Sequence, residues 1–313
     1  MVSTSGGGRA APTSQARARI VTAVVIGAVA ALLDLAPWLL TGGRLPLQNL
    51  WADSTSPEQM PRALLPFSQY AVVLLLALVV VGYGTAGVAL RAVGVRRAHP
   101  MVLATAAALL VVHLVAVVQT TAVVGGGLQE HPASTLYLAA LLAVVAVSVL
   151  VGLVVTGLVV ARSRASAVIG LSVVATLLPS WLGAFAALPW EPSGGDGGLQ
   201  VLAVVSRWLP ALLVGASIAL SGLASPGRLA GALGALVVLW VVPAGTTAVG
   251  AAAGSRALLR QPVELVDYGF AVLRSALLLP EVVLPPLALA VVVALVGTAA
   301  VRLVARRRSR VTG

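Results

Sequence analysis

One acidic residue lies inside a long apolar stretch of this sequence. Asp34 falls in the run from Ile20 to Leu40. A carboxyl group is costly in an apolar medium unless it has a partner, a proton or a wet cavity, so it is a functional candidate by default. Arg207 lies at a similar depth in a later run and could pair with Asp34. The alternatives are a purely structural ion pair, or an Arg207 that extends outward and an Asp34 that faces a wet crevice.

Two further polar side chains lie in the apolar run 101–124. His113 falls near the middle of this run, and Gln119 lies closer to its end. A single histidine with no second histidine, cysteine or helix-spaced acid cannot hold a metal or a haem by itself, so we predict no metal site and no cofactor. His113 is either a hydrogen-bonded interior residue or part of a proton relay. Asp34, Arg207, His113 and Gln119 together form the predicted polar locus.

Several classes of enzyme chemistry lack their residues here. The chain has no lysine for a Walker motif, and we find no H-E-x-x-H, G-x-S-x-G or EF-hand pattern. It has no cysteine, which excludes disulfides, zinc-thiolate sites and thiol catalysis. No catalytic residue is therefore predicted, and whether the protein is an enzyme stays open, with the balance against it.

The elements that must position these residues are membrane spans. The 313 residues are 59% hydrophobic and 9% charged, with a mean hydropathy of +1.05. That is too little polar surface to cover a water-soluble globule, so the bilayer must be the main partner. The net charge of +11 comes from arginines at the ends of apolar runs, not from a patch with interleaved aromatics, so no nucleic acid is expected.

Eight apolar runs have the length that crosses a bilayer, about 20 residues each. A chain in lipid must satisfy its backbone hydrogen bonds locally, which requires helices. The sequence therefore predicts an all-α polytopic integral membrane protein with eight transmembrane helices. The spans are 20–40, 69–92, 101–124, 136–161, 166–189, 201–223, 229–250 and 283–304.

The spans fall into two similar sets of four. Aligned without gaps, 103–123 and 229–249 share 11 of 21 residues and both end in Thr-Thr-Ala-Val. Val25-Ile26-Gly27 in the first span recurs as Val168-Ile169-Gly170 in the fifth. Each unit has an even number of helices, so we predict two parallel four-helix repeats related by an axis along the membrane normal. In this alignment Asp34 corresponds to about Leu177 and His113 to Leu239, so the second unit lacks the polar site.

The arginines predict the orientation. With the N-terminus in the cytoplasm, the inner segments hold 14 arginines and no acid, whereas the outer segments hold 6 arginines. This is the positive-inside pattern, and it places both termini in the cytoplasm of a plasma-membrane protein. The predicted organisation is a disordered tail 1–18, repeats 19–164 and 165–308, and a basic tail 309–313.

Two of the predicted outer segments contain more apolar residues than a simple connecting loop requires. Residues 41–68 contain apolar side chains that should lie at the membrane interface. Residues near 262–279 have the pattern of an amphipathic helix, which would lie flat on the outer leaflet or cap the bundle. The alternative for this second segment is a short re-entrant hairpin.

These features favour a non-enzymatic, permease-like protein or an accessory membrane subunit, with membrane protein partners or a second copy of the chain as possible partners. Transport rests here on the duplicated architecture and the buried acid. The alternative is an outer-face membrane enzyme that acts on a lipid-linked substrate and uses Asp34, Asp53 or Glu58.

Overall fold

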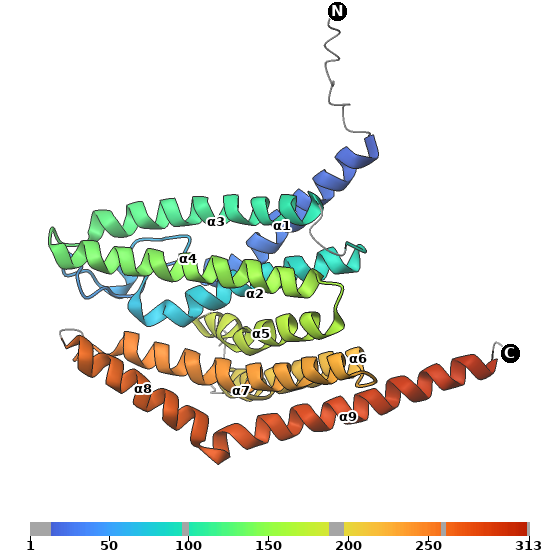
Figure 1. Ribbon diagram of the computed structural model, residues 1–313. Helices are drawn as coiled ribbons and strands as arrows, with labels where there is room; N and C mark the ends of the chain where they lie inside the picture. The colour runs from blue at the N-terminus through green and yellow to red at the C-terminus, as the bar shows by residue number, and fades with distance from the viewer. Residues whose placement is uncertain (1–13, 96–99, 188–196, 258–260, 312–313) are drawn as a thin grey trace, which may run out of the picture.

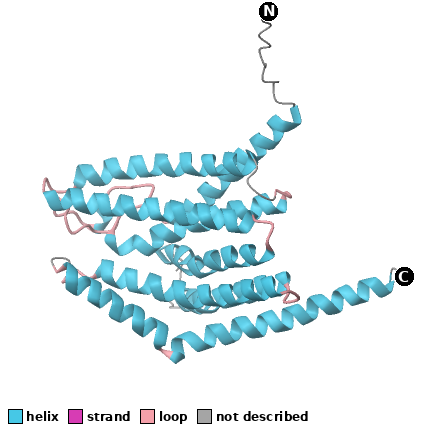
Figure 2. Cartoon of the chain, in the orientation of Figure 1, coloured by secondary structure: helices cyan, strands magenta, loops and turns pink. Residues whose placement is uncertain are grey.

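The computed structural model describes residues 14–95, 100–187, 197–257 and 261–311. Within these ranges the chain is helical except for the connections (Figure 2). Eight of the helices are long and apolar enough to cross a membrane, as predicted. The long helices are α1 (Ser14–Leu40), α2 (Val72–Ala92), α3 (Pro100–Gly127), α4 (Pro132–Val160), α5 (Arg164–Gly183), α6 (Gly197–Ser221), α7 (Pro226–Gly254) and α9 (Pro280–Val311).

The helix ends follow from local sequence. Ser163 and Ser225 precede α5 and α7, and their side chains accept hydrogen bonds from backbone N–H groups of the first turn. His131 does the same for α4, where Pro132 occupies the first helical position. Gly94 and Gly222 follow α2 and α6 with φ angles of 81° and 74°, which suits the glycine that commonly terminates a helix.

The predicted tails are only partly described. Most of the N-terminal tail, residues 1–13, lies outside the described residues, and α1 already begins at Ser14. At the other end, α9 continues through the predicted basic tail as far as Val311. An apolar helix therefore extends into the polar flanking sequence at both ends of the chain.

The two sets of four helices have corresponding neighbours. In the first, α1 packs against α2 and α3, and α2 packs against α4. In the second, α5 packs against α6 and α7, and α6 packs against α9. Helices α3 and α7, which carry the two Thr-Thr segments, run in the same direction (Figure 1). The two sets meet chiefly where α5 lies against α2 and α4.

Small residues let the first and third helices of each set approach closely. A methyl group added at Gly27 of α1 would lie 2.5 Å from the carbonyl oxygen of Thr105 in α3. The Thr105 hydroxyl donates to the Ala23 carbonyl at 2.8 Å. In the second set, a methyl group at Gly231 of α7 would lie 2.5 Å from Ala165 of α5. Gly231 is the residue that aligns with Thr105, so the two crossings share an aligned position on α3 and α7.

The connection between α1 and α2 is folded onto the end of the first set. Leu45, Met60, Leu65 and Phe67 are buried there in one cluster with residues of α1 to α4. The Trp38 indole donates to the Ala63 carbonyl at 2.8 Å. The apolar side chains that marked residues 41–68 therefore pack against helices of the bundle.

The segment after α7 forms a helix, α8 (Pro262–Leu278), which does not lie across the end of the bundle. It turns back along α7 (Figure 1), and the indole of Trp240, halfway along α7, donates to the Leu277 carbonyl at 3.0 Å. The chain then breaks at Leu279 and continues as α9. The predicted helix is therefore present and packs along α7, while its placement on the outer leaflet or as a re-entrant segment stays a prediction.

Candidate functional site

Asp34 and His113 meet inside the first set of helices. The imidazole Nε2 of His113 lies 3.3 Å from the carboxylate Oδ2 of Asp34. Asp34 is 1% exposed and His113 is 2% exposed, so both side chains are enclosed by protein. Two of the predicted site residues are therefore in contact.

Helix α2 forms the wall beside this pair. Gly82 lies against the carboxylate so closely that a methyl group there would be 1.8 Å from Asp34 Oδ2. The ring of the next residue, Tyr83, lies 5.6 Å from the imidazole ring between centroids. Its hydroxyl is buried and has no hydrogen-bond partner among the residues that the structure describes. Gly152 of α4 leaves the space that the Tyr83 ring occupies. Tyr83 was not predicted; its position inside a glycine-rich span, next to Gly82 and Gly84, was the available signal.

The hydrogen bonds fix how many protons the pair needs. His113 Nδ1 lies 2.9 Å from the Leu109 carbonyl oxygen, which can only accept, so Nδ1 carries a proton. In a neutral imidazole, Nε2 then presents a lone pair toward the Asp34 carboxylate. The contact is attractive only with one further proton, on Nε2 or on the carboxyl group. The site can therefore hold one exchangeable proton.

Arg207 does not pair with Asp34 in the described part of the chain; of the alternatives left open by the sequence, the structure agrees with an Arg207 that lies at the surface. Among the residues that the structure describes, the recorded ion pair of Asp34 is with His113. Arg207 is exposed, and its guanidinium lies 5.1 Å from the centre of the neighbouring Trp208 ring. Equal depth along two helices does not make their side chains neighbours, because α5 packs against both α1 and α6.

Arg207 instead lines a pocket in the second set of helices. This pocket has a volume of about 490 Å³ and is bounded by α5, α6, α7, α8 and α9. Glu281, in the first turn of α9, lines it as well, together with the hydroxyl-bearing residues Thr176, Ser180, Ser206, Thr246 and Thr247. It is called the Arg207 pocket below.

One stretch of α5 touches both sites. Pro179 and Ser180 line the Arg207 pocket, and the indole of the next residue, Trp181, donates to the Asp34 backbone carbonyl at 2.9 Å. A change in the path of α5 at Pro179 would therefore reach both the Asp34 pair and the pocket.

Gln119 lies apart from Asp34 and holds the loop between α1 and α2. Its carbonyl oxygen accepts from the Leu64 backbone N–H at 2.9 Å, and the Thr120 hydroxyl accepts from Leu65 N–H at 3.0 Å. Gln119 is thus a structural residue in this arrangement. Its aligned position in α7 is Gly245, and there the Thr246 and Thr247 hydroxyls donate to the Pro243 carbonyl within their own helix.

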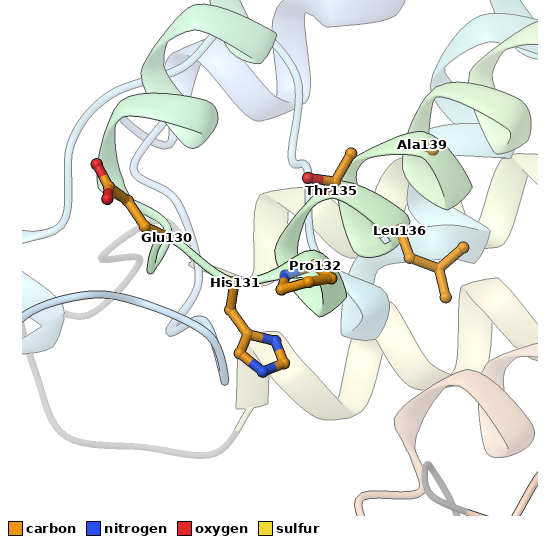
Figure 3. Close-up of a pocket in the computed structure, with 6 residues that line it drawn as sticks. All are labelled: Glu130, His131, Pro132, Thr135, Leu136 and Ala139. Carbon is orange, nitrogen blue, oxygen red and sulfur yellow. The ribbon is translucent and has the colours of Figure 1, made fainter.

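The turn between α3 and α4 carries a hollow with two titratable residues, Glu130 and His131 (Figure 3). Their side chains point in different directions in this view, and His131 Nδ1 accepts from Ala133 N–H at 3.1 Å. His131 therefore caps α4, and the two groups do not converge on a common point.

Under the alternative hypothesis of a membrane enzyme, the candidate acids are Asp34, Asp53 and Glu58, but Asp53 and Glu58 do not share a site with Asp34. Asp34 is enclosed, whereas Asp53 and Glu58 are exposed in the loop before α2. A hydrogen bond from its own backbone N–H, aided by the Ser56 side chain, lowers the pKa of Glu58. In the described part of the chain, no group of three histidine or acidic residues is placed to bind a metal ion.

The second set of helices has leucines at the two positions that align with Asp34 and His113. Leu177 and Leu239, which align with Asp34 and His113, are 2% and 6% exposed. Both pairs of positions are therefore interior, and only the first set places polar groups in them.

The fold and the site together define a class: an all-helical protein with eight long apolar helices, as in helical membrane proteins, and one buried acid–imidazole pair. No protein-family model matches the chain, and no curated protein or solved structure is found to match it.

Proposed function

We propose that this chain is a permease-like protein, or the membrane subunit of a transporter, whose Asp34–His113 pair binds and releases a proton. The observation that carries the proposal is this pair itself, enclosed in an apolar bundle at 3.3 Å. Burying two ionisable groups is costly, and a leucine pair at the equivalent positions of the second set avoids that cost. Retaining the polar pair in one set therefore calls for a role beyond packing.

Two parallel four-helix repeats are the architecture that we propose for this function. It is supported by the corresponding helix neighbours, by the equivalent crossings at Thr105 and Gly231, and by the common direction of α3 and α7. Rigid units of this kind can rock against each other around a fixed site. The contacts of α5 with α2 and α4 support a boundary between the two units at α5, which touches both sites.

The location and partners follow from the same reasoning. The arginine distribution supports a plasma-membrane protein with both termini in the cytoplasm. Exposed apolar residues along α3 and α4, such as Val111, Leu114, Leu150 and Val154, would face lipid, a partner subunit or a second copy.

Proton movement across liposomes tests the proposal. The purified chain is reconstituted with a pH-sensitive dye inside, and a potassium gradient with valinomycin supplies the driving potential. We expect internal pH to change faster than in protein-free liposomes, and Asp34→Asn to abolish at least nine tenths of that excess rate. Asp53→Asn removes an exposed acid and is the matched control. A wild-type rate equal to that of empty liposomes, or an unchanged rate in Asp34→Asn, would contradict the proposal.

A further inference from the structure

The Arg207 pocket has the size and position of a small-molecule site. Its volume of about 490 Å³ lies within the roughly 300 to 1,000 Å³ that ligand pockets occupy. It is formed where five helices meet, including the break between α8 and α9. Most of its lining is apolar, with a limited number of polar groups, which is the usual composition of a site that orients a ligand.

The pocket presents charges of opposite sign that do not neutralise each other. Arg207 and Glu281 both line it, yet among the described residues neither forms an ion pair with the other or with a third residue. The guanidinium lies 5.1 Å from the centre of the Trp208 ring, and no carboxylate of the described residues forms an ion pair with it. A single ligand that carries both an anionic and a cationic group would satisfy both residues.

Three prolines leave backbone carbonyl groups in the lining of the Arg207 pocket without their usual helical hydrogen bond. Pro210, Pro243 and Pro286 lie inside α6, α7 and α9, and each lacks the N–H that would bond to the carbonyl four residues earlier. Those carbonyls belong to Ser206, Leu239 and Val282, and all three residues line the pocket. Freed backbone carbonyls of this kind are suitable acceptors for an ammonium group or a cation in a membrane protein.

We infer that the Arg207 pocket binds a small zwitterion, with its anionic group on Arg207 and its primary ammonium group on Glu281 and the freed carbonyls. This inference names the class of solute for the permease-like function and takes its meaning from that proposal. The same chemistry is found in a free amino acid and in the phosphoethanolamine head group of a phospholipid, and the experiment separates these two sources.

The test is equilibrium dialysis with the full-length chain in detergent. One arm uses a ¹⁴C-labelled mixture of the twenty amino acids, and the other uses ¹⁴C-labelled glycerophosphoethanolamine. We expect saturable binding in at least one arm, weakened roughly ten- to hundredfold by Arg207→Gln and by Glu281→Gln, since each removes one charged partner. Arg274→Gln and Glu264→Gln change exposed residues of α8 outside the pocket lining and should bind like the wild type.

Each result has a defined meaning. Binding in the first arm alone assigns a free amino acid, binding in the second alone assigns a lipid head group, and binding in both supports the shared chemistry. Absence of saturable binding in both arms, or binding that both pocket variants leave unchanged, overturns the inference.

Competition on the wild type keeps the inference testable even if a variant fails to fold. Propionate and ethylamine each carry only one of the two charges. Neither should displace the bound label at concentrations where the unlabelled zwitterion does. Full displacement by either compound at those concentrations would show that the pocket does not require both charges, which also overturns the inference.

This test is independent of proton movement. Asp34→Asn should keep the zwitterion binding of the wild type while it loses proton flux. Binding that fails while the flux is present overturns the pocket inference alone. Flux that is absent while the binding is present overturns the proposed proton function alone.

Discussion

The free-energy cost of burying Asp34 and His113 can be measured by replacing both with leucine, the residue found at the aligned positions 177 and 239. Asp34→Leu alone leaves the His113 imidazole enclosed without its acid, and breaking a buried pair in this way costs roughly 3 to 5 kcal/mol. Asp34→Leu with His113→Leu copies Leu177 and Leu239, and such apolar replacements are often neutral or stabilising by about 1 to 4 kcal/mol. We therefore expect the single variant to unfold at a lower temperature than the wild type and the double variant to match or exceed it.

Thermal unfolding followed by the fluorescence of the six tryptophans provides the measurement. Liposome flux is recorded for the same preparations. A stable double variant without flux separates function from structure at this site. A double variant less stable than Asp34→Leu alone would instead make the pair a stabilising element of the fold.

Gly82 sets the position of the carboxylate. Gly82→Ala would place a methyl group 1.8 Å from Asp34 Oδ2 and 2.7 Å from its Cβ, so the side chain or helix α2 must shift. Overpacking of this kind costs about 1 to 3 kcal/mol. We expect a lower melting temperature together with reduced proton flux.

Gly157→Ala in α4 is the control for that change, because nothing lies within 4 Å of its added methyl group. Alanine favours a helix interior over glycine by up to about 1 kcal/mol, so this variant should be at least as stable as the wild type. Equal melting temperatures for Gly82→Ala and the wild type would argue against the close contact at Asp34.

Sequence reasoning singled out Asp34 and His113 but left the partner of Asp34 open. An acid and a histidine inside apolar runs stand out because water-free surroundings penalise both. The depth of a residue in the membrane can be calculated from the sequence, at about 1.5 Å per helical residue. Which helices are neighbours in the plane of the membrane cannot. His113 reaches Asp34 because α1 and α3 cross closely at Gly27, and α5 lies between α1 and α6. Neither arrangement can be predicted from the sequence of a single helix.

At the scale of elements, the loop between α1 and α2 depends on two side chains of α3. Gln119→Leu with Thr120→Val removes the acceptors of the Leu64 and Leu65 N–H groups. Each buried N–H left without a partner costs about 1 to 3 kcal/mol, so the loop should detach more often. We expect faster tryptic cleavage after Arg44 and Arg62, measured by intact mass spectrometry.

Thr246→Val with Thr247→Val is the matched control from the aligned segment of α7. Within the described ranges these hydroxyls bond to the Pro243 carbonyl of their own helix and not to the loop, so cleavage of the loop should keep its wild-type rate. Similar cleavage rates in the two double variants would mean that Gln119 and Thr120 do not hold the loop.

The elements themselves were largely predictable, because an apolar run of spanning length has few alternatives to a helix. The path of α8 was not. Its amphipathic pattern indicates a helix near 262–279, but the pattern fits a surface position and a position along α7 equally well. The choice depends on Trp240, whose indole reaches the Leu277 carbonyl from the middle of α7.

At the scale of the whole molecule, the internal similarity rests on few discriminating residues. Two alanine-, valine- and leucine-rich segments share many residues by composition alone, so identity between 103–123 and 229–249 is weak evidence. The packing adds independent support, because the aligned positions Thr105 and Gly231 both occur where the first and third helices of a set cross. The Asp34 pair and the Arg207 pocket break this symmetry, one in each set.

Parallel repeats and the arginine distribution make one joint prediction about sidedness. If both sets have the same orientation, the α2–α3 and α6–α7 connections lie on the cytoplasmic side, and the α3–α4 turn lies outside. The chain has no cysteine, so single-cysteine variants report their position without background. Val93→Cys and Ala224→Cys test the inner side, and Asp53→Cys and Glu130→Cys test the outer side, all at exposed positions.

A membrane-impermeant maleimide applied to intact cells should label the two outer variants and spare the two inner ones until the cells are permeabilised. Labelling of all four in permeabilised cells verifies that each thiol is reactive. Inner variants that label in intact cells while the outer ones do not would invert the orientation but keep the repeats parallel, because Val93 and Ala224 still behave alike. Opposite behaviour of Val93→Cys and Ala224→Cys would place equivalent turns on different sides, and two parallel units could not then describe this chain.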